Sequence, residues 1–199
     1  MLVVIAGPSG AGKGTVVRRL LERESGLWYS VSATDRPPRP EEVEGRDYRF
    51  LTHDEFCRLR DDGGLLEWFE VYGDLKGTPR APVENHLAGG DDVVIEVDVQ
   101  GARAIRDAQA DAFLVFLRPP SREVQTARLR ERAEAEAELS GAPVDERELS
   151  RRLASAEAEE AAAADFDAIV VNDDLDRTVD ELVSLLEALR RGTGTVPAD

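Results

Sequence analysis

The sequence predicts an α/β fold: a three-layer α/β/α core in which helices flank a parallel sheet, with a small mixed α/β insert and a helical lid. Two observations predict the core. Short β-rich runs alternate with helical stretches along most of the 199 residues, which is typical of βαβ crossovers around a buried parallel sheet. The first apolar run also leads directly into a glycine-rich loop and then into a helical stretch, a common start for such a crossover.

The core elements are expected in a regular order. Strands are predicted at residues 2–6, 93–98, 113–117 and 168–171, followed by helices that run to about 23, from about 101, from 121, and over 175–190. The last helix places four leucines on one face, as expected for a helix that packs against a sheet: Leu182, Leu185, Leu186 and Leu189.

Two stretches break the alternation. Between residues 34 and 78, a proline-rich opening, an aromatic segment, a short helix after Thr52 and an alternating run at 65–71 predict a β-rich insert. Residues 133–164 are almost entirely Ala, Glu, Arg and Leu, interrupted by APVD, which predicts a mobile helical hairpin outside the core; a simply solvated helix has the same composition. The expected division is a core of 1–33, 79–122 and 165–191, an insert of 34–78, a lid of 123–164 and a flexible tail of 192–199.

Composition excludes several classes of function. With 25 Lys plus Arg against 41 Asp plus Glu, the net charge of −16 argues against binding to DNA or RNA. The single Cys57 cannot form an internal disulfide, and the absence of a long apolar run argues against a membrane span, so we expect a cytoplasmic protein. His53 and His86 are too few for a histidine metal cage, and we expect both to be ordinary surface or loop residues.

The segment GPSGAGKGT is the clearest chemical signal. A strand, a glycine-rich loop and a helix start direct several backbone N–H groups toward one point, which suits a di- or triphosphate. Gly14 stands where a Mg²⁺-binding hydroxyl is usual, so the ion is expected to be held by phosphates, water and distant carboxylates. The predicted nucleotide-binding residues of this P-loop are Gly7, Pro8, Ser9, Gly10, Ala11, Gly12, Lys13, Gly14 and Thr15.

A second anion site is predicted between residues 32 and 48. An acceptor that is itself a phosphate needs its own cations, and arginine offers a planar donor fork. Each arginine taken alone is commonly a surface residue, so only the combination is informative. The residues expected to converge are Ser32, Arg36, Arg39 and Tyr48.

At this point the sequence resembles guanylate kinase over nearly the whole chain. The matching segments are GPSGAGKGT, SVSATDRPPRPEEVEGRDYRF, LLEW, GTP at 77–79, IEVDVQGA, RPPS at 118–121 and IVVNDDLD at 169–176. The resemblance implies a P-loop kinase that transfers the γ-phosphoryl group of ATP to GMP, and to dGMP, with Mg²⁺. Its expected partners are therefore ATP and GMP, with no nucleic acid and no membrane, in a monomer or homodimer.

The resemblance also implies roles for individual residues. Ser32, Arg36, Arg39 and Tyr48 would hold the GMP phosphate, and Glu67 would accept hydrogen bonds from guanine, with Thr78 and Glu96 nearby. Lys76 stands where the family has a tyrosine and would contribute a positive charge instead. The catalytic cations would be Lys13, Arg39, Arg132 and Arg152, with Arg128 and Asn172 at the ATP.

Two assignments carry alternatives, that of Asp98 and that of the second lid arginine. Glu96 and Asp98 follow a predicted central strand, where ligand groups gather in such folds, and are expected to contact Mg²⁺ through water. The alternative for Asp98 is a structural role as a hydrogen-bond acceptor. The lid is longer than in the family, which leaves Arg147 and Arg151 as alternatives to Arg152.

Two other functions fit parts of the pattern. Guanylate-kinase-like domains also serve as binding modules, but these typically lose the P-loop, whereas this chain keeps its lysine. A kinase of the same fold that acts on a ribose phosphate would not need Glu67 or the SVSATDRPPR segment.

Overall fold

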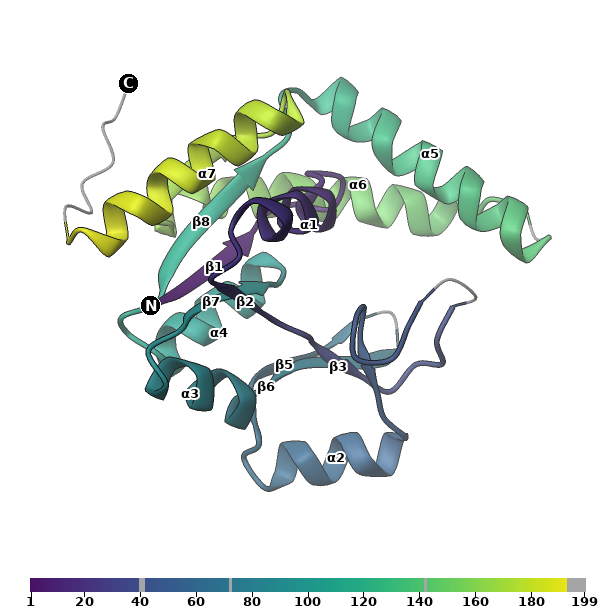
Figure 1. The fold of residues 1–199 in the computed structure, drawn as a ribbon. Helices are drawn as coiled ribbons and strands as arrows, with labels where there is room; N and C mark the ends of the chain where they lie inside the picture. Colours follow the sequence, from purple (N-terminus) through teal and green to yellow (C-terminus); the bar gives the residue numbers. More distant parts are fainter. Residues whose placement is uncertain (40–41, 72, 142, 193–199) are drawn as a thin grey trace. The chain divides into compact units, whose positions relative to one another are not determined.

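The computed structural model describes residues 1–39, 42–71, 73–141 and 143–192 (Figure 1). Its larger sheet has the strand order β2-β7-β1-β8-β9. The five strands are β1 (Leu2–Ala6), β2 (Leu27–Ser30), β7 (Asp92–Glu96), β8 (Phe113–Arg118) and β9 (Ala168–Val171). β2 pairs with β7, and β8 with β9, in parallel, which confirms the predicted parallel sheet.

The predicted core helices are present, with small shifts at their ends. They are α1 (Lys13–Arg23), α4 (Val99–Ala108), α5 (Arg122–Ser140) and α7 (Leu175–Arg190), and α6 (Glu146–Ala161) lies in the segment predicted as a helical lid. Polar side chains cap two of them: Ser121 accepts a hydrogen bond from the backbone of Val124, and Asp174 from that of Arg177. α4 begins two residues before the predicted position, and β7 ends two residues earlier than predicted.

The second sheet is mixed and has the order β4-β3-β6-β5, as expected for the insert. It consists of β3 (Ala33–Thr34), β4 (Arg49–Phe50), β5 (Leu65–Val71) and β6 (Asp74–Pro79). β3 runs parallel to β4 and antiparallel to β6, and β5 and β6 form an antiparallel pair. The helix predicted after Thr52 is α2 (His53–Asp61), which begins with a capping box between Thr52 and Glu55.

The elements that the sequence did not predict include β2 and α3 (Arg80–Ala88). β2 has only four residues, and Trp28 and Tyr29 within it are half-buried, so it lacks the continuous apolar run of the other strands. The helix α3 contains a proline in its first turn and buries only Val83, so its sequence shows little helical periodicity.

The chain divides into two compact units. The first comprises Met1–Val4, Ser25–Ile95 and Gln100–Ala112 and contains the second sheet. The other comprises Ile5–Glu24, Glu96–Val99 and the described chain from Phe113 onward, and it contains the phosphate loop and the helices α5, α6 and α7.

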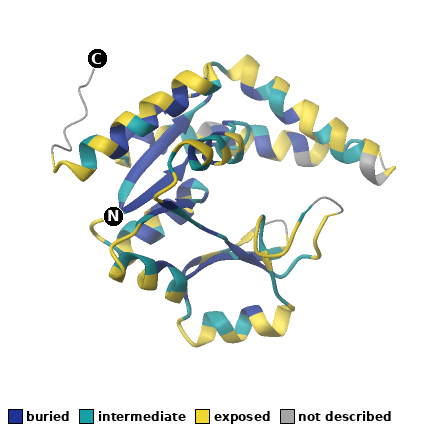
Figure 2. Ribbon diagram, viewed as in Figure 1, coloured by how far each residue is buried: buried dark blue, intermediate teal, exposed yellow. Residues whose placement is uncertain are grey.

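Buried residues concentrate on the strands (Figure 2). In the first unit, Phe56 of α2 packs with Ala33, Leu65 and Leu75. In the other unit, Ala162 and Ala163 of the short 3-10 helix η1 (Ala162–Asp165) pack with Val99 and Phe116. The expectation that residues 133–164 lie wholly outside the core is therefore wrong at their C-terminal end, where small alanines fit closely against an aromatic ring.

None of the described helices combines the length and the hydrophobicity that crossing a bilayer requires. In the predicted tail, only Gly192 belongs to the described residues, and residues 193–199 lie outside them.

Candidate active site

In the phosphate loop, which connects β1 to α1, Gly7 and Gly12 adopt backbone conformations that would strain any other residue. Gly7 has a φ of 151°, and a Cβ there would collide with the carbonyl oxygen of Leu117. Gly12 is the N-cap of α1 with a φ of 89°, a left-handed conformation that glycine adopts freely. This path leaves the first N–H groups of α1 without helical partners and favours an anion at that point.

Side chains from α5 and from the residue after β9 anchor this loop. Asn172 is buried and donates its amide to the carbonyl oxygen of Ala11 at 2.7 Å, while Thr178 donates to the Asn172 Oδ1 at 3.3 Å. Gln125, also buried, donates to the carbonyl oxygen of Ser9 at 2.8 Å. Because the loop carbonyls are held in this way, its N–H groups keep a fixed direction.

Lys13 and Glu159 contribute opposite charges to the loop. The Lys13 ammonium donates to the carbonyl oxygens of Gly7 at 2.6 Å and Pro8 at 3.2 Å. Glu159 of α6 accepts a hydrogen bond from the backbone of Ser9. Burial raises the pKa of the Glu159 carboxyl above its ordinary value; Lys13 opposes the rise and Asp98 adds to it.

A cavity of about 760 Å³ opens beside the loop and contains most of the predicted ATP-site residues. Among the residues that line it, those that the sequence singled out are Ser9, Gly10, Gly12, Lys13, Gly14, Thr15, Glu96, Arg128, Arg132 and Asn172. The predicted loop residues Gly7, Pro8 and Ala11 are buried and do not line the cavity, so they shape the backbone of the loop. Arg128 reaches across to the carbonyl oxygen of Asn172 at 3.2 Å.

The surroundings of Gly14 bear on the expected Mg²⁺. A Cβ at position 14 would lie 3.5 Å from the Glu96 Oε2, so this carboxylate is directed at the place where a P-loop hydroxyl would stand. No group of three or more His, Cys, Asp or Glu side chains in the described residues could hold a metal ion by itself. Glu96, Asp98 and Thr15 offer the oxygen ligands that Mg²⁺ prefers, but they are too few to hold the ion by themselves. Oxygens of phosphates and water would complete its coordination.

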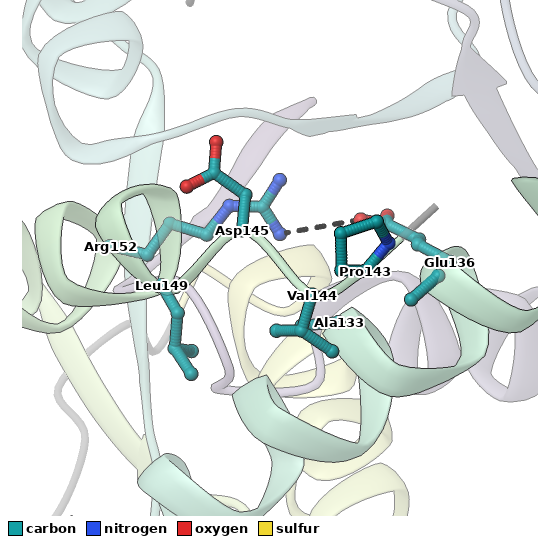
Figure 3. A pocket seen from close by; sticks show the side chains of 8 residues that line it. Ala133, Glu136, Pro143, Val144, Asp145, Leu149 and Arg152 are labelled. Carbon is teal, nitrogen blue, oxygen red and sulfur yellow. Dashed lines mark ion pairs between the residues drawn. The ribbon is translucent and has the colours of Figure 1, made fainter. Parts of the chain in front are cut away.

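Glu136 brings the two predicted lid arginines together. Arg132 donates to the Glu136 Oε1 at 3.1 Å, and the Arg152 Nη1 lies 3.9 Å from the Oε2 of the same carboxylate. Figure 3 shows Arg152 directed from α6 toward Glu136 of α5, in a smaller cavity of about 180 Å³ between these helices. The Arg152 side chain is only 11% exposed there, whereas Arg132 is exposed at the larger cavity. Of the alternatives to Arg152, Arg147 and Arg151 are both exposed.

In the unit with the second sheet, Glu67 and Thr78 form a buried pair. They face each other across β5 and β6, and the Thr78 hydroxyl donates to the Glu67 Oε1 at 2.6 Å. Glu67 is 8% exposed and Thr78 is fully buried. A nearly buried carboxylate is costly unless it is paired or hydrogen-bonded, and the hydrogen bond from Thr78 offsets part of this cost.

The predicted phosphate-binding residues of this unit gather around Tyr48. The Arg36 guanidinium lies 4.9 Å and the Lys76 ammonium 5.2 Å from the centre of the Tyr48 ring. Arg36 donates twice to Glu42, at 2.5 and 2.7 Å, and Glu42 also accepts from the backbone N–H of Arg39 at 2.9 Å. The hydrogen bond from Arg36 lowers the pKa of Glu42, and the same bond raises the pKa of Arg36. A carboxylate thus occupies the kind of donor fork that suits a phosphate.

The remaining members of this set are less closely assembled. Ser32 is buried next to β3, and its carbonyl oxygen accepts from the backbone of Arg49. The Arg39 side chain is exposed.

Asp98, which was predicted to contact Mg²⁺ through water, is half-buried in the other unit and does not line the 760 Å³ cavity.

Sequence reasoning missed four residues that shape these sites: Gln125, Glu159 and Thr178 at the loop, and Glu42 at Arg36. Gln125 gave a weak signal, since a polar residue falls on the inward face of a predicted helix. Glu159 lies in a run of Ala and Glu where nothing distinguishes one carboxylate from the next.

Comparison with known proteins gives a consistent result. The family described as guanylate kinase matches residues 1–189. A guanylate kinase of Rhodococcus jostii is 50% identical over 187 residues, covering 93% of this chain and 86% of that protein. A guanylate kinase of a Mycobacterium species is 48% identical over 199 residues, covering 99% and 96%. The crystal structure of guanylate kinase from Anaplasma phagocytophilum superposes with a TM-score of 0.74 at 30% identity, over 95% of this chain and 85% of that one.

Proposed function

The chain belongs to the guanylate kinase family and is an ATP:GMP phosphotransferase, and from this premise we propose how its residues divide the reaction between a donor site and an acceptor site. The donor site is the 760 Å³ cavity at the phosphate loop. The acceptor site is formed by the second sheet, which carries Glu67, and by the segment before β4, which carries Tyr48.

The observation that carries the acceptor assignment is the Glu67–Thr78 pair. Guanine presents its N1–H and its 2-amino group side by side, two donors that match the oxygens of one carboxylate. Thr78 donates to the Glu67 Oε1 and so fixes the orientation of that carboxylate. Adenine offers an acceptor at N1 and no 2-amino group, so its N1 would face the nearly buried carboxylate of Glu67 acceptor to acceptor, at a cost of about 1–3 kcal/mol or more.

The phosphate of GMP would be bound by the cations around Tyr48. Arg36, Arg39 and Lys76 supply positive charge, and the hydroxyls of Ser32 and Tyr48 supply further donors. Glu42 now accepts from the fork of Arg36, so we infer that an incoming phosphate displaces it or shares that fork. The lowered pKa of Glu42 is consistent with a site that favours an anion.

The transfer itself requires positioning more than covalent chemistry. An oxygen of the GMP phosphate attacks the γ-phosphorus of ATP, a P–O bond forms on the acceptor side, and the bond to the departing ADP oxygen breaks in line with it. The N–H groups at the start of α1 and the Lys13 ammonium would hold the β- and γ-phosphates. Arg128 and Asn172, which line the same cavity, would border the nucleoside.

When bound, Mg²⁺ supplies neutralisation of the charge on the phosphate oxygens. Glu96 is directed at position 14 and would take part in holding the ion, with Asp98 and Thr15 acting through water.

Arg39, Arg132 and Arg152 complete the proposed set of catalytic cations. Glu136 holds Arg132 and Arg152 on one carboxylate, which keeps two like charges close together at a reduced electrostatic cost. Arg152 is favoured over Arg147 and Arg151 because it is the one whose side chain is enclosed beside Arg132.

The broader assignments are also proposals. We infer a core of residues 1–33, 79–122 and 165–191, a GMP-binding insert of 34–78 and a lid within 123–164 whose last residues, Ala162 and Ala163, pack into the core. The activity on dGMP, the cytoplasmic location and a monomeric or homodimeric state are inferred from composition and from the family.

A coupled assay of ADP release with a panel of acceptors tests this function. The expected order of kcat/KM places GMP first and dGMP near it, with AMP, CMP and UMP lower by about 100-fold or more. Equal rates with AMP would contradict the role of Glu67. A preference for a ribose phosphate would favour the sugar-phosphate alternative, and no turnover with any acceptor would favour a non-catalytic binding module.

A further inference from the structure

A cluster of chemically reactive side chains lies in the unit with the second sheet, and the kinase reaction does not use it. His53 and Cys57 are one helical turn apart on α2, and the Cys57 Sγ lies 3.5 Å from the His53 Nε2. The other ring nitrogen, Nδ1, lies 2.7 Å from the Oδ2 of Asp35, which follows β3. Thiol, imidazole and carboxylate therefore form a continuous chain of contacts.

Asp35 is held in place independently of His53. Its Oδ1 accepts a hydrogen bond from the backbone N–H of Leu75 at 2.6 Å, and its side chain is only 7% exposed. The ionised carboxylate can only accept, so the His53 Nδ1 carries the proton of this contact. In the neutral imidazole the Nε2 is then the basic nitrogen, and it is this nitrogen that faces the thiol.

Helical spacing explains only part of this arrangement. Any two residues four apart on a helix can touch, but Asp35 comes from a different element, 18 residues before His53. Arg60 of the same helix, which is paired with Asp61 at 2.8 Å, also interacts electrostatically with Cys57. A nucleophile, a base, a third group that orients the base and a nearby cation are the components that activate a cysteine thiol.

We propose that Cys57 is a nucleophilic thiol activated by the His53–Asp35 pair, and that it is a site of S-thiolation by low-molecular-weight disulfides. His53 takes the proton from Cys57, and the thiolate attacks one sulfur of the disulfide. A new S–S bond forms to Cys57 as the original S–S bond breaks, and His53 returns the proton to the leaving thiolate. The products are the mixed disulfide and one free thiol, so no further oxidant is needed.

The chain favours a small partner for this thiol. Cys57 is its single cysteine, so no second thiol of the same chain can resolve the mixed disulfide. The His53 side chain is 70% exposed, which leaves the base open to solvent. Cys57 itself is partly buried against the cluster of Phe56 and Leu65, which limits the size of what can reach it.

The test follows the mixed disulfide formed with oxidised glutathione, measured by intact-mass spectrometry at about pH 7 and about pH 9.5, on either side of the ordinary thiol pKa. Three variants are compared with wild type. His53→Gln removes the base; Asp35→Asn keeps an oxygen for the Leu75 N–H and removes the charge at His53. His86→Gln is the matched control, because it alters the other histidine, which contacts Asp91 and stacks on Trp28.

At about pH 7 we expect His53→Gln to react at least about tenfold more slowly than wild type, Asp35→Asn to be intermediate, and His86→Gln to be unchanged. At about pH 9.5 the rates should converge, because hydroxide then takes the proton that His53 takes at about pH 7. Equal rates of wild type and His53→Gln at about pH 7 would overturn the proposal. A deficit in His53→Gln that is the same at both pH values would also overturn it, because it would indicate altered access instead of lost activation.

Discussion

Replacing Glu67 by Gln isolates the feature that is proposed to select guanine. Gln has nearly the same shape and retains an oxygen that can accept from Thr78, so the β5–β6 pairing has no reason to change. The substitution removes the negative charge and puts an NH₂ group where the second carboxylate oxygen stood. That NH₂ would face one of the two guanine donors.

The magnitude follows from the buried position of Glu67. A hydrogen bond to a charged group contributes about 1.5–3 kcal/mol, and a buried donor left facing another donor costs about 1–3 kcal/mol. The two effects together are worth about 3 kcal/mol or more for GMP, which corresponds to about 100-fold or more in kcat/KM. For AMP the substitution removes an unfavourable charge, so its kcat/KM should stay constant or rise.

The assay is the coupled ADP-release reaction with GMP and with AMP, run on wild type, Glu67→Gln and Glu70→Gln. Glu70 is the matched control, since it lies on the same strand but is exposed to solvent. We expect the GMP/AMP ratio to fall by about 100-fold or more in Glu67→Gln and to remain unchanged in Glu70→Gln. An unchanged ratio in Glu67→Gln would refute the reasoning.

Three further predictions concern the unit with the phosphate loop. Gly14→Ser should raise the free energy of unfolding by about 0.5 kcal/mol, because serine favours the helix more than glycine does. It should also change the dependence of kcat on Mg²⁺ concentration, because the new hydroxyl would lie next to Glu96. An unchanged Mg²⁺ titration would count against the role of Glu96. The raised pKa of Glu159 means that the folded state holds the proton of this carboxyl more tightly than the unfolded state does. Wild type should therefore lose stability relative to Glu159→Gln as pH rises above the ordinary pKa of 4.5. A stability difference in urea unfolding that does not vary with pH would contradict this. Glu136→Gln should lower the free energy of unfolding by about 1 kcal/mol because the enclosed Arg152 loses a counter-charge, while Glu138→Gln, on an exposed part of the same helix, should have no effect in the same urea titration.

Four strands of the larger sheet and the phosphate loop could be predicted because local sequence determines them. The apolar run before Gly7 and the spacing of the loop glycines specify a strand, a turn and a helix start without reference to the rest of the chain. β2 could not be predicted in this way, because its half-buried Trp28 and Tyr29 resemble a loop until β7 pairs with them. Tertiary pairing, not local propensity, makes that segment a strand.

The sequence could predict which residues belong to the site, but it could not predict which of them contact one another. Glu67 and Thr78 were named from their motifs, and their hydrogen bond depends on the β5–β6 register. The capture of Arg36 by Glu42 could not be read from a segment with several neighbouring glutamates. The expectation that His53 is an ordinary surface residue came from counting histidines, which cannot show that Asp35 lies beside it.

The most direct test of the central claim is a crystal structure with GMP and a non-hydrolysable ATP analogue bound together. We expect the triphosphate at the N-terminus of α1 beside Lys13, and the guanine ring with its N1–H and 2-amino group on the carboxylate of Glu67. A guanine bound away from Glu67, or a second sheet without any nucleotide, would contradict the account.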